Sequence, residues 1–354
     1  MFLASRWSGK SLRDVRAQSI NAESLGADIF MTMENAHEPF MPLALAAEHT
    51  KNLQLWTGIA ISFNRSPMVT ANTAFDLQEA SGGRFVLGLG PQVKGHNERR
   101  FSVPWTPPVP RMREYIASLR AIWRCWELNE KLNFRGNHYR FDLMTPNFSP
   151  PPSKQPMVPI TLAAVGPAMI KLAGELSDGV QLHPFCTRKY FDNVVKPELE
   201  RGMEAGGQSR ENLCLSGGGF LVTGPDSETV ARLSEFVRYR VAFYGSTRTY
   251  WPVLEQHDLL DLGAKLHDLA RRGLWDEMAK EIDDDVLRLF AVIGTHDEVL
   301  PQIGERFGGQ IDLIMPMSSP SDDPKVTGDW VRSVHEMSVP FKGFVDRWGS
   351  KELP

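Results

Sequence analysis

Residues 66–90 decide the fold, with the sequence SPMVTANTAFDLQEASGGRFVLGLG. Ser66 is a good N-cap residue, and Pro67 suits the first position of a helix. Apolar side chains then recur at helical spacing over the following residues. Gly82 and Gly83 come next, and glycines commonly end a helix. The sequence therefore predicts an amphipathic helix that starts at Pro67 and stops before the two glycines.

A short apolar run, residues 84–89, follows the glycines and is typical of a strand buried on both faces. Gly88 and Gly90 leave the carboxyl end of this strand bare of side chains, so a flat ligand could approach the backbone there. A plain tight turn would explain the same glycines. A helix that leads directly into a buried strand is the repeating unit of parallel α/β folds.

Together with this stretch, five further segments resemble the bacterial-luciferase-like superfamily, and in particular its coenzyme F420-dependent branch. They are TGIAISFNRSP (57–67), RMREYIASLRAIW (111–123), FRGNHYRF (134–141), AAVGPAMIKLAGELSDGV (163–180) and GTHDEV (294–299). The resemblance covers most of residues 20–316. It implies an α/β fold, a (β/α)8 TIM barrel with insertions, that binds a flavin or a deazaflavin.

The length of 354 residues is in keeping with this fold, since one such barrel with insertions commonly takes roughly 250 to 400 residues. We therefore expect a single luciferase-like domain over residues 1–354. Residues 227–282 have a helical pattern longer than one crossover needs, and we interpret them as an insertion over the barrel mouth. Residues 318–354 form a polar C-terminal tail.

Composition limits the partners and the compartment. The 39 basic and 43 acidic side chains give a net charge of -4 without long runs of one sign, which argues against nucleic acid. Cys125, Cys186 and Cys214 lie far apart without metal-type spacing and are interpreted as free thiols in a reducing compartment. The amino terminus has no signal pattern, and no run of about 18 apolar residues occurs. We expect a cytoplasmic protein without a membrane span, and the resemblance implies a homodimer.

The remaining elements follow from apolar periodicity, glycines and prolines. Strands are predicted at 2–4, 28–33, 53–62, 159–163, 179–182, 213–222 and 312–316, and Gly217, Gly218 and Gly219 interrupt the strand 213–222. Helices are predicted at 15–25, 42–49, 112–126, 167–176 and 190–205; one further helix starts at the run 283–285, and another runs from the capping box of Thr295 and Glu298 to Phe307. A hairpin is predicted at 134–141, and loops are predicted at 91–110 and 149–159. The acidic run 283–285 is interpreted as a helix start, so no metal site is predicted.

Three residues are predicted to be catalytic: Glu34, His37 and His96. Each follows the carboxyl end of a barrel strand, where active sites of this fold lie. The resemblance places Glu34 at a commonly acidic position that contacts the ring or the substrate, and a carboxylate or an imidazole there could relay a proton. Many deazaflavin-dependent members carry a His where this chain has Asn35. They also carry a Glu just past the glycine-rich strand, where this chain has Pro91, Gln92 and Val93. The assignment of acid and base therefore stays open.

Eight residues are predicted to bind the cofactor. They are Gly58, Ile59, Arg65, Gly90, Gln92, Ala164, Val165 and Gly166. The resemblance implies a non-prolyl cis peptide at Gly58–Ile59, where a bulge backs the cofactor ring; a glycine that merely allows close strand packing is the alternative. The turn from Ala164 to Gly166 leads a strand into a helix, and the free N–H groups of a helix amino end suit a phosphate.

Coenzyme F420 is the preferred cofactor, with FMN as the alternative. F420 carries an anionic tail that calls for cations, and Arg65, Lys94, Arg99 and Arg100 follow the third and fourth strands. A deazaflavin is a hydride carrier, so the predicted reaction is hydride transfer to or from a small organic molecule. The alternatives are an FMN-dependent monooxygenase served by a separate flavin reductase and a flavin-binding barrel without catalytic activity.

Overall fold

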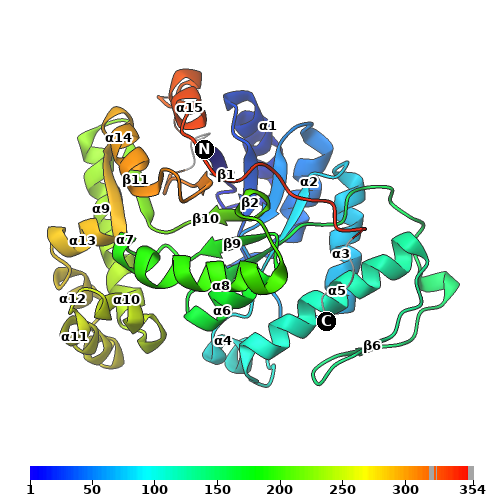
Figure 1. Cartoon of the computed structure of the whole chain (residues 1–354). Coiled ribbons are helices and arrows are strands. Elements are labelled where there is room, and N and C mark those ends of the chain that lie inside the picture. Colours follow the sequence, from blue (N-terminus) through cyan, green and yellow to red (C-terminus); the bar gives the residue numbers. More distant parts are fainter. Residues whose placement is uncertain (319–322, 324, 350–354) are drawn as a thin grey trace.

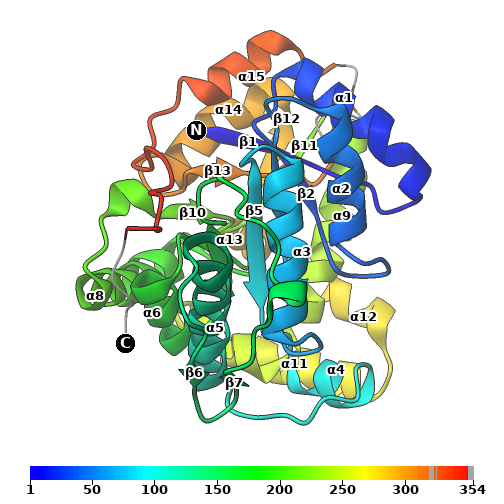
Figure 2. The same cartoon turned by 90° about the vertical axis from the view of Figure 1, so that its right-hand side faces the viewer.

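The computed structural model describes residues 1–318, 323 and 325–349, and eight parallel strands close into a barrel (Figures 1 and 2). The barrel strands are β1 (Phe2–Arg6), β2 (Ile29–Thr32), β3 (Gln54–Thr57) with β4 (Ala60–Ile61), β5 (Phe85–Gly90), β8 (Ile160–Ala164), β9 (Gly179–Leu182), β10 (Cys214–Ser216) and β13 (Leu313–Ile314). Pairing of β3 with β5 closes the ring, and β3 and β4 are two pieces of one strand position. The predicted TIM barrel is confirmed.

Helices surround the barrel and cover its ends. They are α1 (Val15–Leu25), α2 (Phe40–His49), α3 (Pro67–Ala80), α4 (Lys94–Arg99), α5 (Pro108–Leu128), α6 (Pro167–Leu176), α7 (Arg188–Tyr190), α8 (Lys196–Gly206), α9 (Ser227–Gly245), α10 (Trp251–Glu255), α11 (Leu260–Arg271), α12 (Trp275–Lys280), α13 (Asp284–Phe290), α14 (His296–Phe307) and α15 (Gly328–His335). The described helices include none long and apolar enough to span a bilayer.

Helix α3 forms as its sequence predicts. The Ser66 hydroxyl accepts a hydrogen bond from the Met68 amide, and Pro67 occupies the first turn. Gly82 and Gly83 adopt φ angles of +64° and +85°, in the left-handed region that favours glycine. The chain then enters β5, whose six residues are all buried. The strand is held between β3 with β4 on one side and β8 on the other.

A polar layer inside the barrel explains the polar third strand. Thr57 Oγ1 donates to the Gly88 carbonyl and accepts from the Gly88 amide, both at 2.8 Å. Gln181 Nε2 donates to the Thr57 carbonyl at 3.0 Å and to Thr161 Oγ1 at 2.7 Å. A Cβ on Gly88 would lie 1.8 Å from the Thr57 carbonyl oxygen. Gly88 therefore serves close strand packing, and the prediction that it clears space for a ligand is wrong.

Three elements were not predicted. Helix α15 begins in the stretch after Ser318 that was expected to be a polar tail, and its apolar side chains Trp330, Val331 and Val334 are buried. Helix α4 lies within the region predicted as the loop 91–110, and α5 begins at Pro108 inside the same region. Buried Asn97 fixes α4, since its Nδ2 donates to the carbonyls of Pro91 and Val93. Strand β12 (Ala291–Thr295) was also missed. Within the described part of the chain its one partner is β11 (Phe220–Gly224), and the two form a small parallel sheet separate from the barrel.

The other local predictions hold. Residues 217–219 have φ angles of +87°, +83° and +152° and separate β10 from β11. Strands β6 (Phe134–Arg135) and β7 (Arg140–Phe141) form the antiparallel hairpin. Asp283 caps α13, and the capping box of Thr295 and Glu298 starts α14. All three cysteines are free thiols.

The two ends of the barrel are covered by different parts of the chain. In Figure 2, α4, α11 and α12 lie at the end toward which the β5 arrow points, and the amino terminus and α15 lie at the other. The first of these is the carboxyl end of the strands, where functional sites of this fold are found. Residues of the 227–282 segment therefore lie beside the strand ends.

Candidate functional site

The third strand breaks at the barrel mouth, between β3 and β4. The peptide bond from Gly58 to Ile59 is cis, which confirms that prediction. The Gly58 amide donates to the Thr32 carbonyl at 2.6 Å. A Cβ on Gly58 would lie 2.2 Å from Met31 Sδ, so any larger residue here would have to displace the Met31 side chain. Binding of a cofactor ring by Gly58 and Ile59 stays a prediction.

Glu34 fastens this broken strand. Its Oε2 accepts hydrogen bonds from the Ile61 amide at 2.7 Å and from Arg65 Nη1 at 2.6 Å, and its Oε1 accepts from Asn64 Nδ2 at 3.1 Å. Only 7% of the Glu34 side chain and 18% of the Arg65 side chain are exposed. Arg65 Nη1 also donates to the Ile61 carbonyl. Both predicted site residues are thus engaged with each other and with the strand end.

The two predicted catalytic histidines lie apart from this ion pair. His37 is exposed, and its ring centroid is 5.4 Å from that of Trp7. His96 is exposed on α4. The loop of His37 and the end of α4 are joined, because Nη2 of Arg100, the C-cap residue of α4, donates to the carbonyl of Asn35. The structure therefore brings this loop and α4 together, although it gives neither histidine a hydrogen bond to Glu34.

Gly90 and Gln92 lie just beyond, at the end of β5. A Cβ on Gly90 would be 2.9 Å from Ile59 Cδ1 and 3.2 Å from Ala163 Cβ, so the strand end is packed against its neighbours. Gln92 has a φ of +58°, and its Oε1 accepts from the Val93 amide at 2.8 Å. The chain turns sharply here into α4. Gly90 thus lies against Ile59, and cofactor binding by Gly90 and Gln92 stays a prediction.

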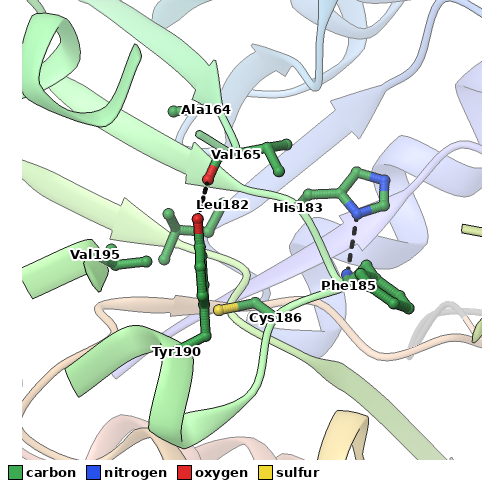
Figure 3. Close-up of a pocket in the computed structure, with 8 residues that line it drawn as sticks. All are labelled: Ala164, Val165, Leu182, His183, Phe185, Cys186, Tyr190 and Val195. Atoms are coloured by element: carbon green, nitrogen blue, oxygen red, sulfur yellow. Dashed lines mark hydrogen bonds between the residues drawn. The ribbon is translucent and has the colours of Figure 1, made fainter. Parts of the chain in front are cut away.

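The turn from Ala164 to Gly166 presents an open helix amino end. Gly166 is the N-cap residue of α6, and no heavy atom lies within 4 Å of where its Cβ would be. The following residues, Pro167 and Ala168, are exposed. The Tyr190 hydroxyl fixes the turn by donating to the Val165 carbonyl at 2.9 Å (Figure 3). Pro167 has no N–H, and the Met169 amide donates to the Gly166 carbonyl at 3.1 Å, so the open space and the N–H groups of Gly166 and Ala168 are what fits a phosphate.

His183, to which the sequence analysis assigned no role, is a titratable group at the mouth whose pKa is strongly shifted. It follows β9, and its Nδ1 accepts a hydrogen bond from the Phe185 amide at 3.0 Å (Figure 3). Its ring centroid lies 4.3 Å from that of Tyr244 and 4.9 Å from that of Tyr250. Burial, together with the positive charge of Arg240, lowers the pKa of His183 to about 3. The imidazole is therefore neutral near pH 7, with its hydrogen on Nε2.

A signal for His183 was present in the sequence, because it directly follows a correctly predicted strand. Its aromatic neighbours come from α9 and from the 3-10 turn Arg248–Tyr250, about 60 residues later in the chain. His183 also borders a small pocket (Figure 3). The residues that line this pocket are Ala164, Val165, Leu182, His183, Phe185, Cys186, Tyr190 and Val195. Ala164 and Val165 of the predicted turn thus border the same pocket as His183.

Comparison with protein families identifies the fold family. The model of the luciferase-like monooxygenase family matches residues 3–312. The chain belongs to this family. An uncharacterised protein of Mycobacterium tuberculosis is 43% identical over 299 residues, which cover 84% of this chain and 88% of that protein. The 5,10-methylenetetrahydromethanopterin reductase of Archaeoglobus fulgidus is 27% identical over 298 residues, 82% of this chain and 84% of the reductase.

Solved structures of this luciferase-like family show the same fold. The coenzyme F420 dependent tetrahydromethanopterin reductase from Methanopyrus kandleri superposes with a TM-score of 0.74 at 20% identity, over 95% of this chain and 97% of the reductase. The oxygenating constituent of 3,6-diketocamphane monooxygenase from Pseudomonas putida, in complex with FMN, gives a TM-score of 0.64 at 18% identity, over 96% and 99%. The architecture therefore occurs with either cofactor.

Proposed function

We propose that this luciferase-like protein is an oxidoreductase that transfers a hydride between coenzyme F420 and a small organic substrate. The observation that carries the proposal is the similarity to the A. fulgidus reductase over more than four fifths of both chains. A reductase reaction needs a bound hydride carrier and a hydrogen-bonding group for the substrate. The barrel mouth offers residues suited to both tasks.

The open amino end of α6 would hold a cofactor phosphate, at Gly166. Lys94 and Arg99 are exposed on α4 and could bind further negative charges of the F420 tail, since Lys94 has only a loose pairing with Glu98 at 3.9 Å. The bound deazaflavin would supply the site that accepts or donates a hydride. Gly58, Ile59 and Gly90 lie together at the break in the third strand and would form the backing of its ring.

His183 would act on the substrate as a neutral hydrogen-bond donor. Its Nδ1 is held by the Phe185 amide, so Nε2 carries the hydrogen and can donate to a carbonyl or hydroxyl oxygen. Because the imidazole stays neutral, it can stabilise growing negative charge on that oxygen without a preceding proton transfer. Tyr244 and Tyr250 hold the ring in place.

The predicted roles of Glu34, His37 and His96 remain open to test. We propose that Glu34 is a positioning residue, because its carboxylate already accepts three hydrogen bonds at the strand break. His37 is exposed on the loop after β2 and His96 is exposed on α4, so either would exchange protons with solvent if it takes part. A homodimer in the cytoplasm stays a prediction, and light scattering during size-exclusion chromatography tests the dimer.

An FMN-dependent monooxygenase with a separate reductase is the second candidate. The FMN complex of the P. putida enzyme favours it, because the same fold holds FMN there. FMN carries a single phosphate, for which the amino end of α6 would suffice. Lys94 and Arg99 would then have no function in cofactor binding. A barrel that binds a flavin without catalysis is a third, weaker possibility.

Titration of the purified protein with F420 and, separately, with FMN tests the proposal through cofactor fluorescence. We expect micromolar affinity for F420 and an affinity for FMN at least tenfold weaker. The double variant K94Q/R99Q should weaken F420 binding several-fold and leave FMN binding unchanged. The reverse preference would overturn the hydride-transfer proposal in favour of a monooxygenase, and binding of neither would remove its support.

A further inference from the structure

An arginine with little to bind lies beside His183, in a cluster formed by Arg240, Phe236, Tyr244, Tyr250 and His183, here termed the arginine–aromatic cluster. The Arg240 guanidinium carbon is 5.7 Å from the Phe236 ring centroid and 5.1 Å from that of Tyr244. Tyr244 in turn packs against His183, at 4.3 Å between ring centroids. The cation therefore lies one aromatic ring away from the proposed substrate donor.

Arg240 has few hydrogen-bond partners and no ion pair among the described residues. Its Nη2 donates to the Tyr244 hydroxyl, and its buried Nε has no hydrogen-bond partner. No described carboxylate forms an ion pair with it. Arg238, two residues earlier on α9, pairs with both Glu235 and Asp284. Glu235 and Asp284 thus lie near α9, but they pair with Arg238 and not with Arg240.

The groups around Arg240 are uncharged and carry N–H or O–H hydrogen-bond donors. Burial raises the pKa of the Tyr250 phenol to about 12, and the neighbouring Tyr244 acts in the same direction, so Tyr250 keeps its proton. His183 is neutral, and its Nε2 carries a hydrogen. The cluster consequently has one fixed positive charge, several N–H or O–H donors, and no negative group. A guanidinium stacked on aromatic faces suits the planar recognition of carboxylate or phosphate oxygens.

We propose that the arginine–aromatic cluster is an anion-binding subsite, so that the substrate is a ring-containing or otherwise apolar compound bearing a carboxylate or phosphate. In this arrangement Arg240 binds the anionic group, the tyrosine rings contact the apolar part, and His183 Nε2 donates to the oxygen at the reacting carbon. The inference rests on the proposed function for the reaction, though the binding of an anion does not depend on the cofactor.

Binding of three small probes to the full-length protein without cofactor tests the subsite. The probes are benzoate, phenyl phosphate and benzyl alcohol, measured by isothermal titration calorimetry at pH 7. We expect one or both anions to bind at least tenfold more tightly than the uncharged alcohol, and the tighter of the two identifies the anionic group. The Arg240→Met variant should lose this preference, with a tenfold or greater loss of anion affinity.

Arg248→Met is the matched control, because Arg248 also lies over an aromatic ring, that of Trp251 at 5.7 Å, but is exposed. Its anion affinity should stay within twofold of wild type. Arg240→Gln keeps a polar side chain without the charge, and it replaces Arg240→Met if that variant fails to fold. Equal affinity for benzoate, phenyl phosphate and benzyl alcohol in the wild type, or unchanged anion affinity in the folded Arg240 variant, would overturn the proposal.

The same protein samples are titrated with F420, which separates the two proposals. Wild type and the Arg240 variant should bind F420 equally, because Arg240 is assigned to the substrate. Loss of F420 binding in the variant alone would assign Arg240 to the cofactor and overturn the substrate subsite. Absence of F420 binding in the wild type would defeat the proposed reaction, while the probe affinities would still decide whether the anion subsite exists.

Discussion

The burial of one residue, His183, makes the stability of the folded protein depend on pH. His183 has a pKa of about 3 in the folded protein, against an ordinary value near 6.5, because burial and Arg240 disfavour its charged form. The unfolded chain therefore takes up a proton that the folded protein does not. This contribution to stability is complete above about pH 6.5 and is lost as the pH falls toward 3.

We predict that His183→Phe makes the protein less sensitive to mild acid. Between pH 7 and pH 5, the free energy of unfolding of the wild type should fall by roughly 2 kcal/mol more than that of the variant, because other titrating groups are common to both. Urea unfolding at pH 7, 6 and 5 measures the difference. His96→Phe, which replaces an exposed histidine, serves as the control. Parallel pH profiles for wild type and His183→Phe would show that His183 is not held neutral.

The third strand position of the barrel is broken between β3 and β4, and the Glu34 carboxylate holds the chain together there. Glu34 connects the loop after β2 to β4 through the Ile61 amide and to Arg65 through its guanidinium. Removal of the carboxylate would leave the Ile61 N–H group without its partner, and it would leave the mostly buried Arg65 with only a looser pairing to Glu38, at 3.7 Å. Breaking such a pair on one side typically costs more than the pair itself contributes.

We predict that Glu34→Ala lowers the free energy of unfolding by about 3 kcal/mol. Glu98→Ala is the matched control, since its partner Lys94 lies 3.9 Å away and both side chains are exposed; its effect should stay below about 0.5 kcal/mol. Urea denaturation followed by tryptophan fluorescence measures both. A Glu34→Ala protein as stable as the control would mean that the carboxylate does not hold the strand and is free for the catalytic role.

The elements show what the sequence could and could not predict. The cap at Ser66, the glycines at 82 and 83 and the capping box at Thr295 are local signals, and each occurs as predicted. Strand β12 was missed because its partner β11 lies about 70 residues earlier, and only that pairing makes residues 291–295 a strand. Burial of His183 likewise depends on rings from α9. Contacts distant in sequence therefore account for what local patterns did not indicate.

At the scale of the whole molecule, the C-terminal segment 336–349 closes the amino end of the barrel. The ring of Phe344 lies 5.9 Å from that of Trp56, which points into the barrel interior, and the Phe341 amide donates to buried Asp312 at 2.9 Å. Arg347 completes the closure by pairing with Asp178, of which only 4% of the side chain is exposed. Asp178 also accepts from the Ile160 amide and pairs with Arg120 at 3.5 Å.

We predict that Arg347→Met loosens this segment without unfolding the barrel, because Arg120 still compensates the Asp178 charge. The free energy of unfolding should fall by about 2 kcal/mol, less than the loss expected for a buried charge left alone. Trypsin should cleave after Lys342 several-fold faster than in the wild type, which mass spectrometry of the released peptide measures.

Arg332→Met is the control, because it also removes one tryptic site but breaks only an exposed pair with Asp329. It should change neither the free energy of unfolding nor the cleavage rate at Lys342. Equal cleavage rates at Lys342 in the two variants would mean that Phe341 and Phe344, rather than the Asp178 ion pair, hold the segment against the barrel, since burial of aromatic rings alone can anchor a chain end.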